Sequence, residues 1–365
     1  MRPPGNRLFE AVTSCLRKQS GWKSSYTLGD PMTFTKLGAL GLGVSMLATG
    51  AAAQDCGDIT ISEMNWASAE LMANVDKIIL EAGYGCSVEL IPGATETTFA
   101  SMNEKGEPDV APELWANAVR VQLTAAEEEG RMHILNQGPI TDLGEGWWVT
   151  DKFSKDHPEL DTVEKVLEHP EMFPDAEDPS KGAFMGGPAG WGCQLNNANL
   201  FRAFGMADKG WVLVDPGSAA GLDGSIAKAS ERGEPWFGYY WSPTSLIGKY
   251  HLRLLPFEVP FAGRDNWDNC IVKPDQDCLD PKPTAWTESA VYTVVTDNFM
   301  KVGGDAAGYF EKRVFPGTAM NEMLVYMSEN QATGEDAAYH FLETYEDLWT
   351  GWVPTDAIEK IKSEL

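Results

Sequence analysis

Histidine is scarce and scattered in this chain of 365 residues. The five histidines lie far apart, at positions 133, 157, 169, 251 and 340, so none of the spacings typical of a zinc site occurs. The sequence also lacks the motifs of several enzyme classes: the His-Glu-x-x-His of metalloproteases, the nucleophile elbow of hydrolases and the Gly-Lys-Ser/Thr run that binds phosphates. No enzyme class is therefore indicated, and the only catalytic route left open is paired carboxylates brought together by the fold.

The chain also has few basic residues relative to acidic ones and few long apolar runs. The chain has 28 basic and 54 acidic residues, and residues 54–365 alone have 22 basic and 52 acidic residues, a net charge of −30. This excess of negative charge disfavours binding to nucleic acids and to anionic membranes. Beyond residue 48 no apolar stretch is long enough to cross a bilayer. We therefore expect a soluble protein without a nucleic-acid partner.

The N-terminal region has the pattern of an export signal. Lys36 precedes an apolar run over 37–48, and Ala51–Ala53 follows as a cleavage site. We predict that residues 1–53 are removed and that the rest of the chain is exported to the periplasm. Met32 is a suitable start for this signal, so residues 1–31 are either an over-extended start, which we favour, or a genuine N-terminal extension.

A strand, a helix and a second strand follow one another at the start of the exported part. The pattern predicts strands over Asp58–Met64 and Ser87–Ile91. Between them, apolar residues at helical spacing predict a helix that is capped by Ser68, runs to about Glu81 and is stopped by Gly83. Such a unit favours a parallel sheet with a right-handed crossover.

Later strands divide the chain into two parts. Further strands are predicted at 109–111, 147–150, 210–215, 235–241 and 290–295. We predict an α/β fold with two lobes, each a mostly parallel sheet flanked by helices, joined by a hinge. Lobe 1 is expected from 54–150 and 288–365, and lobe 2 from 151–287. Ligands of such folds lie in the cleft beyond the C-terminal ends of the strands.

The exported part has five cysteines, an odd number. Cys56 and Cys86 each precede a predicted strand, so parallel pairing of those strands would bring both thiols to one end of the sheet. We predict a Cys56–Cys86 disulfide, since export makes disulfides possible. Cys270 and Cys278 would close a small loop, which leaves Cys193 unpaired.

Tryptophan is abundant, with twelve in residues 54–365, and several fall where strands end. Trp66 and Trp115 end the first and third predicted strands, and Trp241 ends a later apolar run. Trp191 lies in a glycine-rich turn, and Trp148 lies with its neighbour Trp147 at the presumed crossover between lobes. Strand ends open on the cleft, so these residues are candidates for ligand contact, with core packing as the alternative for each.

Indole faces attract cations, and methylated ammonium groups, which donate no hydrogen bonds, are favoured guests. Glu145 lies at the same crossover and is predicted either to complement a bound cation or to be a solvated or structural residue. The other tryptophans are assigned mainly to packing: Trp211, Trp236, Trp267, Trp286, Trp349 and Trp352.

These residues lie in motifs that resemble a known family. Over nearly all of residues 56–365 the chain resembles the substrate-binding proteins of glycine betaine/proline betaine ABC importers. The resemblance implies the two-lobed periplasmic-binding-protein fold and a binding protein rather than an enzyme. Such a protein needs no cofactor and delivers a small ligand to permease and ATPase subunits. The shared motifs, in the same order, are Gly190-Trp191-Gly192-Cys193, Tyr239-Tyr240-Trp241-Ser242-Pro243, Val259-Pro260-Phe261 and Gly351-Trp352-Val353.

The resemblance also assigns roles to residues. In this family three tryptophans form a box around the ammonium group, and the matching positions are Trp115, Trp191 and Trp241. Backbone N–H groups of the Gly192-Cys193 turn bind the ligand's carboxylate in betaine binders, in keeping with the anion-binding property of such turns.

Two positions depart from the family pattern. Val119 stands where some betaine binders have a carboxylate-binding histidine, and Gly187 stands where some relatives have a second cysteine. With the additional Trp66 and Trp148 suggesting a tighter pocket, the chain looks most like the branch that binds trimethylamine N-oxide. We favour this ligand, captured by hinge closure in a monomer. Glycine betaine or a related betaine or choline is the first alternative, and a ligand-sensing domain for a membrane receptor is the second.

An acidic loop follows at 265–277. Its carboxylates, on Asp265, Asp268, Asp275 and Asp277, make either a structural calcium site or a solvated acidic loop, and the second reading is favoured because the EF-hand pattern is absent.

Overall fold

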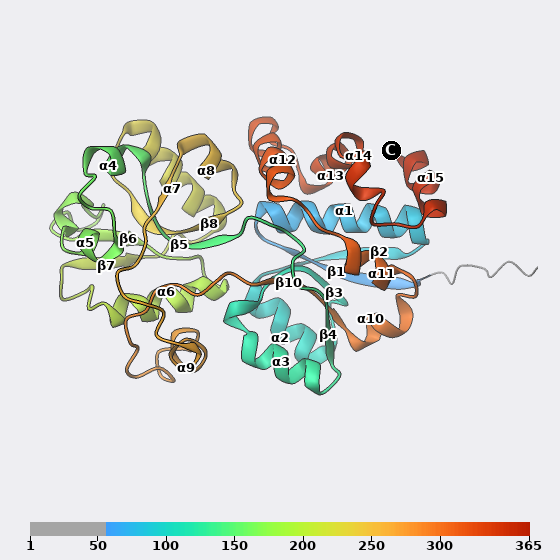
Figure 1. Cartoon of the computed structure of the whole chain (residues 1–365), viewed down its shortest axis with the longest axis horizontal. Helices are drawn as coiled ribbons and strands as arrows, with labels where there is room; N and C mark the ends of the chain where they lie inside the picture. Colours follow the sequence, from blue (N-terminus) through green and yellow to red (C-terminus); the bar gives the residue numbers. More distant parts are fainter. Residues whose placement is uncertain (1–55) are drawn as a thin grey trace, which may run out of the picture. The chain divides into compact units, whose positions relative to one another are not determined.

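The computed structural model describes residues 56–365. The predicted export signal, the start at Met32 and the cleavage after Ala53 lie outside these residues. Within 56–365 the chain forms two five-stranded sheets, each flanked by helices, which confirms the predicted two-lobed α/β fold (Figure 1). No helix of this part combines the length and the apolar character needed to cross a bilayer.

The first sheet has the strand order β2-β1-β3-β10-β4. Strand β10 is antiparallel to both of its neighbours, while β1 pairs in parallel with β2 and β3. Because β10 comes from far along the sequence, the chain leaves this lobe and returns to it. The strands are β1 (Asp58–Met64), β2 (Ser87–Gly93), β3 (Val110–Trp115), β4 (Met132–Asn136) and β10 (Val291–Thr296).

The second sheet has the order β7-β6-β8-β5-β9. Here β5 is the strand that runs antiparallel to its neighbours β8 and β9, and β6 pairs in parallel with β7 and β8. Each sheet is therefore mixed rather than mostly parallel as predicted: two of its four strand pairings are parallel and two are antiparallel, because one strand runs against the other four. The strands are β5 (Gly144–Val149), β6 (Gly182–Met185), β7 (Trp211–Val214), β8 (Phe237–Ser242) and β9 (Arg253–Leu254).

The first lobe boundary differs from the prediction. Residues up to 150 were assigned to lobe 1, but β5 pairs with β8 from Gly144↔Ser242 to Val149↔Phe237 in the second sheet. The chain therefore crosses between the sheets before Gly144 rather than after residue 150. An aromatic strand such as Gly-Glu-Gly-Trp-Trp-Val fits either core, so its sequence does not specify its sheet.

Helix α1 (Ala67–Tyr84) packs on the first sheet and buries Leu71, Val75 and Ile79. The prediction that Gly83 stops this helix was wrong. A Cβ atom at Gly83 would lie 3.1 Å from Ile361 Cδ1, so Gly83 allows a second helix to pack closely. Gly85, in the left-handed conformation with φ of 71°, ends the helix instead.

Helices cover both sides of each sheet. Figure 1 shows α1 on one side of the first sheet and α2 and α3 on the other. The remaining segments of the first lobe are α2 (Thr95–Lys105), the 3-10 turn η1 (Ala116–Ala118), α3 (Arg120–Glu128), α10 (Asp297–Val302), α11 (Ala306–Lys312), α12 (Gly317–Asn330), α13 (Gly334–Thr344), α14 (Glu346–Trp349) and α15 (Thr355–Glu364). Those that follow β5 are α4 (Asp151–Asp156), α5 (Val163–Leu167), η2 (Pro170–Met172), α6 (Gly192–Ala203), α7 (Ala219–Arg232), α8 (Ser245–Tyr250), α9 (Arg264–Asn266) and the π-helical turn η3 (Trp267–Ile271).

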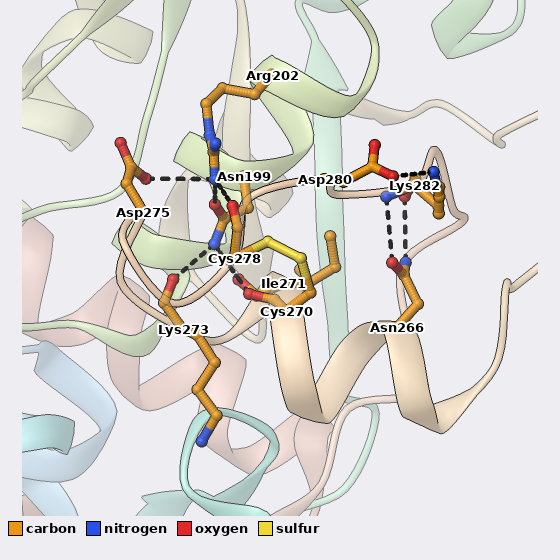
Figure 2. The surroundings of a disulfide bond; sticks show 10 residues. All are labelled: Asn199, Arg202, Asn266, Cys270, Ile271, Lys273, Asp275, Cys278, Asp280 and Lys282. Atoms are coloured by element: carbon orange, nitrogen blue, oxygen red, sulfur yellow. Dashed lines mark hydrogen bonds and ion pairs between the residues drawn. A yellow bond between two sulfur atoms is a disulfide. The ribbon is translucent and has the colours of Figure 1, made fainter.

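Both predicted disulfides are present, and Cys193 is free and buried. Cys56 and Cys86 lie just before paired strands whose register begins at Asp58↔Ser87, as the prediction required. Cys270–Cys278 closes the loop that follows α9. Figure 2 shows Asn199 and Arg202 of α6 pointing into this loop, where Asn199 Nδ2 donates to the carbonyl oxygens of Cys270, Ile271 and Lys273.

Candidate ligand-binding site

Four tryptophans from both lobes surround one point in the structure. In the first lobe, Trp66 lies just after β1 and Trp115 is the last residue of β3. In the second lobe, Trp191 precedes α6 and Trp241 lies in β8. The ring centroids of Trp66 and Trp191 are 5.3 Å apart, those of Trp191 and Trp241 are 5.0 Å apart, and both pairs meet edge to face. We call these four residues the tryptophan cage.

The cage borders a small cavity, in which the centre of a water-sized sphere can occupy about 30 Å³. The structure brings seven of the eight predicted site residues to its wall. The lining residues are Trp66, Thr95, Trp115, Asn117, Ala118, Glu145, Trp191, Gly192, Cys193, Asn196, Tyr239 and Trp241.

Trp148 is the predicted site residue that lies elsewhere. Its indole Nε1 donates to the carbonyl oxygen of Tyr240 at 2.9 Å, and the side chain is buried. Its neighbour Trp147 packs among Phe184, Phe204 and Phe237 in the aromatic core of the second lobe. The expectation that this pair tightens the pocket was wrong, because their strand places both indoles in packing positions. None of the six tryptophans assigned to packing lines the cavity.

Hydrogen bonds fix three of the cage indoles by their N–H groups. Trp66 Nε1 and Trp115 Nε1 both donate to Glu113 Oε1, at 2.8 and 2.9 Å, and Trp191 Nε1 donates to Asn65 Oδ1 at 2.7 Å. The bond from Trp191 to Asn65 joins the two lobes, whereas the bonds of Trp66 and Trp115 lie within the first lobe and position those two rings independently of the second lobe. Such preorganisation reduces the entropic cost of binding.

Glu113 is fully buried behind the cage. Burial raises its pKa to about 6, although hydrogen bonds from Trp115, Trp66 and Ser68 favour its charged form. The sequence reasoning missed it, yet a signal was present: Glu113 and Trp115 are two residues apart on a strand and so face the same side.

Glu145 lines the cavity from β5. Tyr239 donates its hydroxyl to Glu145 Oε1 at 2.9 Å, and Ser289 donates to Oε2 at 3.3 Å. Burial raises the pKa of Glu145 to about 7, against the opposing effect of these hydrogen bonds. A carboxyl group with that pKa is partly protonated near neutral pH and can then donate a hydrogen bond into the cavity. Tyr239, two residues before Trp241, is a second lining residue that alternation along a strand would have identified.

The glycine-rich turn leads into α6, which begins at the cavity wall with Gly192 and Cys193. A Cβ atom at Gly192 would lie 2.2 Å from Ala118 Cβ, so only glycine fits between this turn and the first lobe. The first-turn amides of a helix favour a negatively charged partner. Burial raises the pKa of the Cys193 thiol well above its usual range, which keeps it protonated.

The structure also shows the surroundings of Val119 and Gly187, the two positions that depart from the family pattern. Val119 is buried and does not line the cavity, so this position supplies no side-chain donor where some betaine binders have a histidine. A Cβ atom at Gly187 would lie 2.3 Å from Cys193 Sγ, so glycine leaves room for the free thiol.

The four carboxylates of the acidic loop do not gather around one point. Asp268 pairs with Arg120 of α3, whose Nε donates to Asp268 Oδ1 at 3.2 Å, and Asp265 accepts from Asn269 at 2.8 Å. Among residues 56–365 no group of three or more His, Cys, Asp or Glu side chains is placed to hold a metal ion. Asp265 and Asp268 thus have protein partners instead of facing a shared site.

Comparisons with known proteins bear on this geometry. Residues 57–344 match the family described as the substrate binding domain of the ABC-type glycine betaine transport system. A trimethylamine N-oxide-binding protein from Pelagibacter ubique (strain HTCC1062) is 24% identical over 315 residues, which cover 84% of this chain and 94% of the relative.

Solved structures show the same fold. The glycine betaine, L-proline-binding protein from Borrelia burgdorferi has a TM-score of 0.65 at 16% identity, over 83% of this chain and 99% of that one. A choline-binding protein in complex with choline has a TM-score of 0.64 at 17% identity, over 85% of this chain and 98% of that one.

Members of this family are transport proteins rather than enzymes and need no cofactor. They bind a small ligand and work with the permease and ATPase subunits of an importer. The match over most of the chain, together with the two-lobed fold, places this protein in the family of substrate-binding domains of ABC-type glycine betaine transport systems.

Proposed function

We propose that the protein is the periplasmic binding component of an ABC importer and that its cage captures a trimethylammonium-type osmolyte, with trimethylamine N-oxide as the favoured ligand. The observation that carries the proposal is the cavity bounded by four indoles with Glu145 in its wall. The relative from P. ubique is named as a trimethylamine N-oxide-binding protein, which supports the same ligand.

The methylated end of the ligand fits the cage. Quaternary nitrogen cannot donate hydrogen bonds, so it gains most from aromatic faces, at about 0.5–2 kcal/mol for each contact. Four indoles from two lobes provide such faces on several sides. Completion of the cage requires both lobes, so ligand binding favours the closed arrangement.

The oxygen end of the ligand fits Glu145. An N-oxide presents one negatively polarised oxygen, which a single protonated carboxyl group can satisfy with one hydrogen bond. Among the lining residues of the described chain there is no Arg, Lys or His, so no cationic side chain competes for this role. Glycine betaine is the alternative ligand, because the amides of Gly192 and Cys193 at the start of α6 suit a carboxylate.

Calorimetric titration tests the proposal with trimethylamine N-oxide, glycine betaine, choline and carnitine. Trimethylamine N-oxide is expected to bind at micromolar concentrations and more tightly than the other three. If none of the four ligands binds, the proposal is wrong. If glycine betaine binds best, the transporter class stands and the ligand changes to the alternative.

The pH dependence of ligand affinity tests the contact of the ligand's oxygen with Glu145 separately from the contacts of its methyl groups with the cage. Tyr239 and Cys193, which face Glu145, stay protonated because burial raises their pKa well above the usual range. Glu145 is therefore the group that titrates at this wall. We expect affinity for trimethylamine N-oxide to fall by up to about tenfold per pH unit above about pH 7, as the donor is lost.

Choline provides the control for this experiment. It carries a permanent positive charge, so ionised Glu145 should strengthen its binding as the pH rises. Glu145→Gln keeps a neutral donor at every pH, and its affinity for trimethylamine N-oxide should not change over the same range. A pH dependence that persists in Glu145→Gln would assign the titration to another group.

A further inference from the structure

We infer that Glu113 is a positioning and specificity-determining residue of the cage: one buried carboxylate fixes two of the four indoles from behind and gives the cage its preference for guests with a positively charged nitrogen. This inference rests on the proposed function and deepens it, because it concerns the same cavity.

The geometry of one carboxylate oxygen is the first observation. Glu113 Oε1 accepts from Trp66 Nε1 at 2.8 Å, from Trp115 Nε1 at 2.9 Å and from Ser68 Oγ at 3.0 Å. The donors come from two different segments, the start of α1 and the end of β3. A single side chain thus sets the orientation of both first-lobe indoles of the cage.

The position of Ser68 is the second observation. The prediction that Ser68 caps α1 was wrong: Ser68 is the second residue of this helix, and the N-cap position is occupied by Trp66. The hydroxyl of Ser68 donates to Glu113 Oε1. Ser68 is therefore a third donor that holds the Glu113 carboxylate behind the cage.

Charge balance is the third observation. Arg313 and Asp76 form a fully buried pair, with Arg313 Nε 3.1 Å from Asp76 Oδ1. Tyr309 also donates to Asp76 at 2.6 Å. Arg313 also acts on Glu113 and favours its charged form, so one positive charge serves two buried carboxylates, and one negative charge is in excess beneath the cage when both are ionised. A buried charge of this kind is stabilised when a positive charge binds nearby.

The second oxygen of Glu113 supports the same conclusion. Within the described part of the chain, Glu113 Oε2 is buried without a hydrogen-bond partner. The protein therefore satisfies only one of the two carboxylate oxygens, and the field of the other acts on whatever occupies the cage. A bound ammonium group would complete the charge balance.

The second lobe offers a matched contrast. Trp191 Nε1 is held at 2.7 Å by the neutral side chain of Asn65. Glu113 and Asn65 each hold an indole by accepting a hydrogen bond from its N–H group, but only Glu113 can carry a negative charge. Hydrogen bonds to a charged acceptor are stronger than those to a neutral one, and negative charge at the N–H edge makes the indole face more attractive to a cation. Orientation and charge can therefore be tested separately.

The ligand-free protein provides the first test, by NMR of the indole N–H groups. In Glu113→Gln the resonances of Trp66 and Trp115 should both move, while that of Trp191 stays in place. In Asn65→Leu the reverse is expected. If the resonances of Trp66 and Trp115 do not respond to Glu113→Gln, then Glu113 does not position these two indoles. This result does not depend on which ligand the protein binds.

Titration with tetramethylammonium provides the second test, because this probe has the positive charge but no oxygen. At about pH 8, Glu113→Gln should weaken its binding by about tenfold or more, a loss expected for removal of one nearby buried charge. Affinity for trimethylamine N-oxide, which has no net charge, should fall by clearly less. Equal losses for the two ligands, or an equal change of preference in Asn65→Leu, would overturn the role in specificity.

The two proposals fail in different ways. If the wild-type protein binds no methylated amine, the proposed function is wrong while the NMR test of Glu113 still stands. If Glu113→Gln does not fold, a pH titration of the wild-type protein by NMR tests whether Glu113 holds both indoles. The Trp66 and Trp115 resonances should then shift together, with one midpoint, as the pH is lowered from about 8 to about 5, and separate or absent shifts would reject a carboxylate shared by both indoles.

Discussion

Trp191 lies at the centre of the cage, because it meets Trp66 edge to face on one side and Trp241 on the other. It also makes the link between the lobes through its hydrogen bond to Asn65. Under the proposed function, Trp191 contributes its own face to the ligand and packs against two other cage indoles. Its removal should therefore cost more than one cation–π contact.

Trp191→Ala is expected to weaken binding of trimethylamine N-oxide by about a hundredfold, the equivalent of about two cation–π contacts. Calorimetric titration measures this loss, and circular dichroism checks that the fold is intact. Trp148→Phe is the matched control, since Trp148 lies outside the cavity, and its affinity should stay within about threefold of wild type. Equal losses in both variants would remove Trp191 from the cage.

At the scale of elements, α6 connects the cage to the contact between lobes. The helix begins at Gly192 in the cavity wall, and its Asn199 holds the disulfide loop. Asp268 lies two residues before that loop, in η3, and pairs with Arg120, which begins α3 just after the lining residue Ala118. The acidic loop, for which the sequence favoured a solvated loop over a calcium site, thus contributes an ion pair between the lobes, which we call the interlobe brace.

Asp268→Asn removes the charge of this brace. Because Arg120 is about a third exposed, the effect on stability should be small. Ligand affinity should fall by about three- to tenfold, because the closed state loses one interlobe contact. Calorimetry measures the affinity, and Asp265→Asn, on the same loop but bonded only to Asn269, is the control expected to bind as wild type. A wild-type affinity in Asp268→Asn would contradict the role of the brace.

Gly192→Ala tests how closely α6 must approach the first lobe. The added methyl group would overlap Ala118, which belongs to the other side of the cavity, so the lobes could not close fully. We expect affinity to fall by about a hundredfold. In Gly224→Ala, within α7, the added Cβ meets nothing within 4 Å, so affinity should be unchanged and stability should rise by about 0.5–1 kcal/mol. The two variants are compared by titration and thermal unfolding.

For the whole molecule, buried carboxylates link stability to pH. Burial raises the pKa of Asp76 and Glu113 to about 6 and that of Glu145 to about 7. The folded state therefore binds more protons than the unfolded state between about pH 4 and pH 7, and the free energy of unfolding must fall as the pH rises through this window.

Thermal unfolding of the ligand-free protein should show this dependence. The Tm is expected to be about 2–5 °C higher at about pH 5.5 than at about pH 8. The net charge of −30 over residues 54–365 acts in the same direction, because protonation reduces self-repulsion. The triple variant with Asn, Gln and Gln at these three positions should lose most of the difference, and a higher Tm at alkaline pH would contradict the assignment.

The sequence by itself determined the elements and the contacts that follow from local periodicity. The strand–helix–strand pattern at 58–91 specified a parallel pair of strands, and that register sufficed to pair Cys56 with Cys86. The position of Trp66, Trp115 and Trp241 at strand ends followed from the same pattern, because a strand end in a parallel sheet opens on the cleft.

Only the tertiary structure decided which of these residues meet. Periodicity states which way a side chain faces but not what lies opposite it, so it could not place β5 in the second sheet, turn Trp148 away from the cavity or bring Asp268 to Arg120. The contact of Glu113 with Trp66 likewise could not be predicted from periodicity. Its strand position puts it on the side of Trp115, but its meeting with Trp66, across 47 residues of sequence, depends on two strands packing side by side.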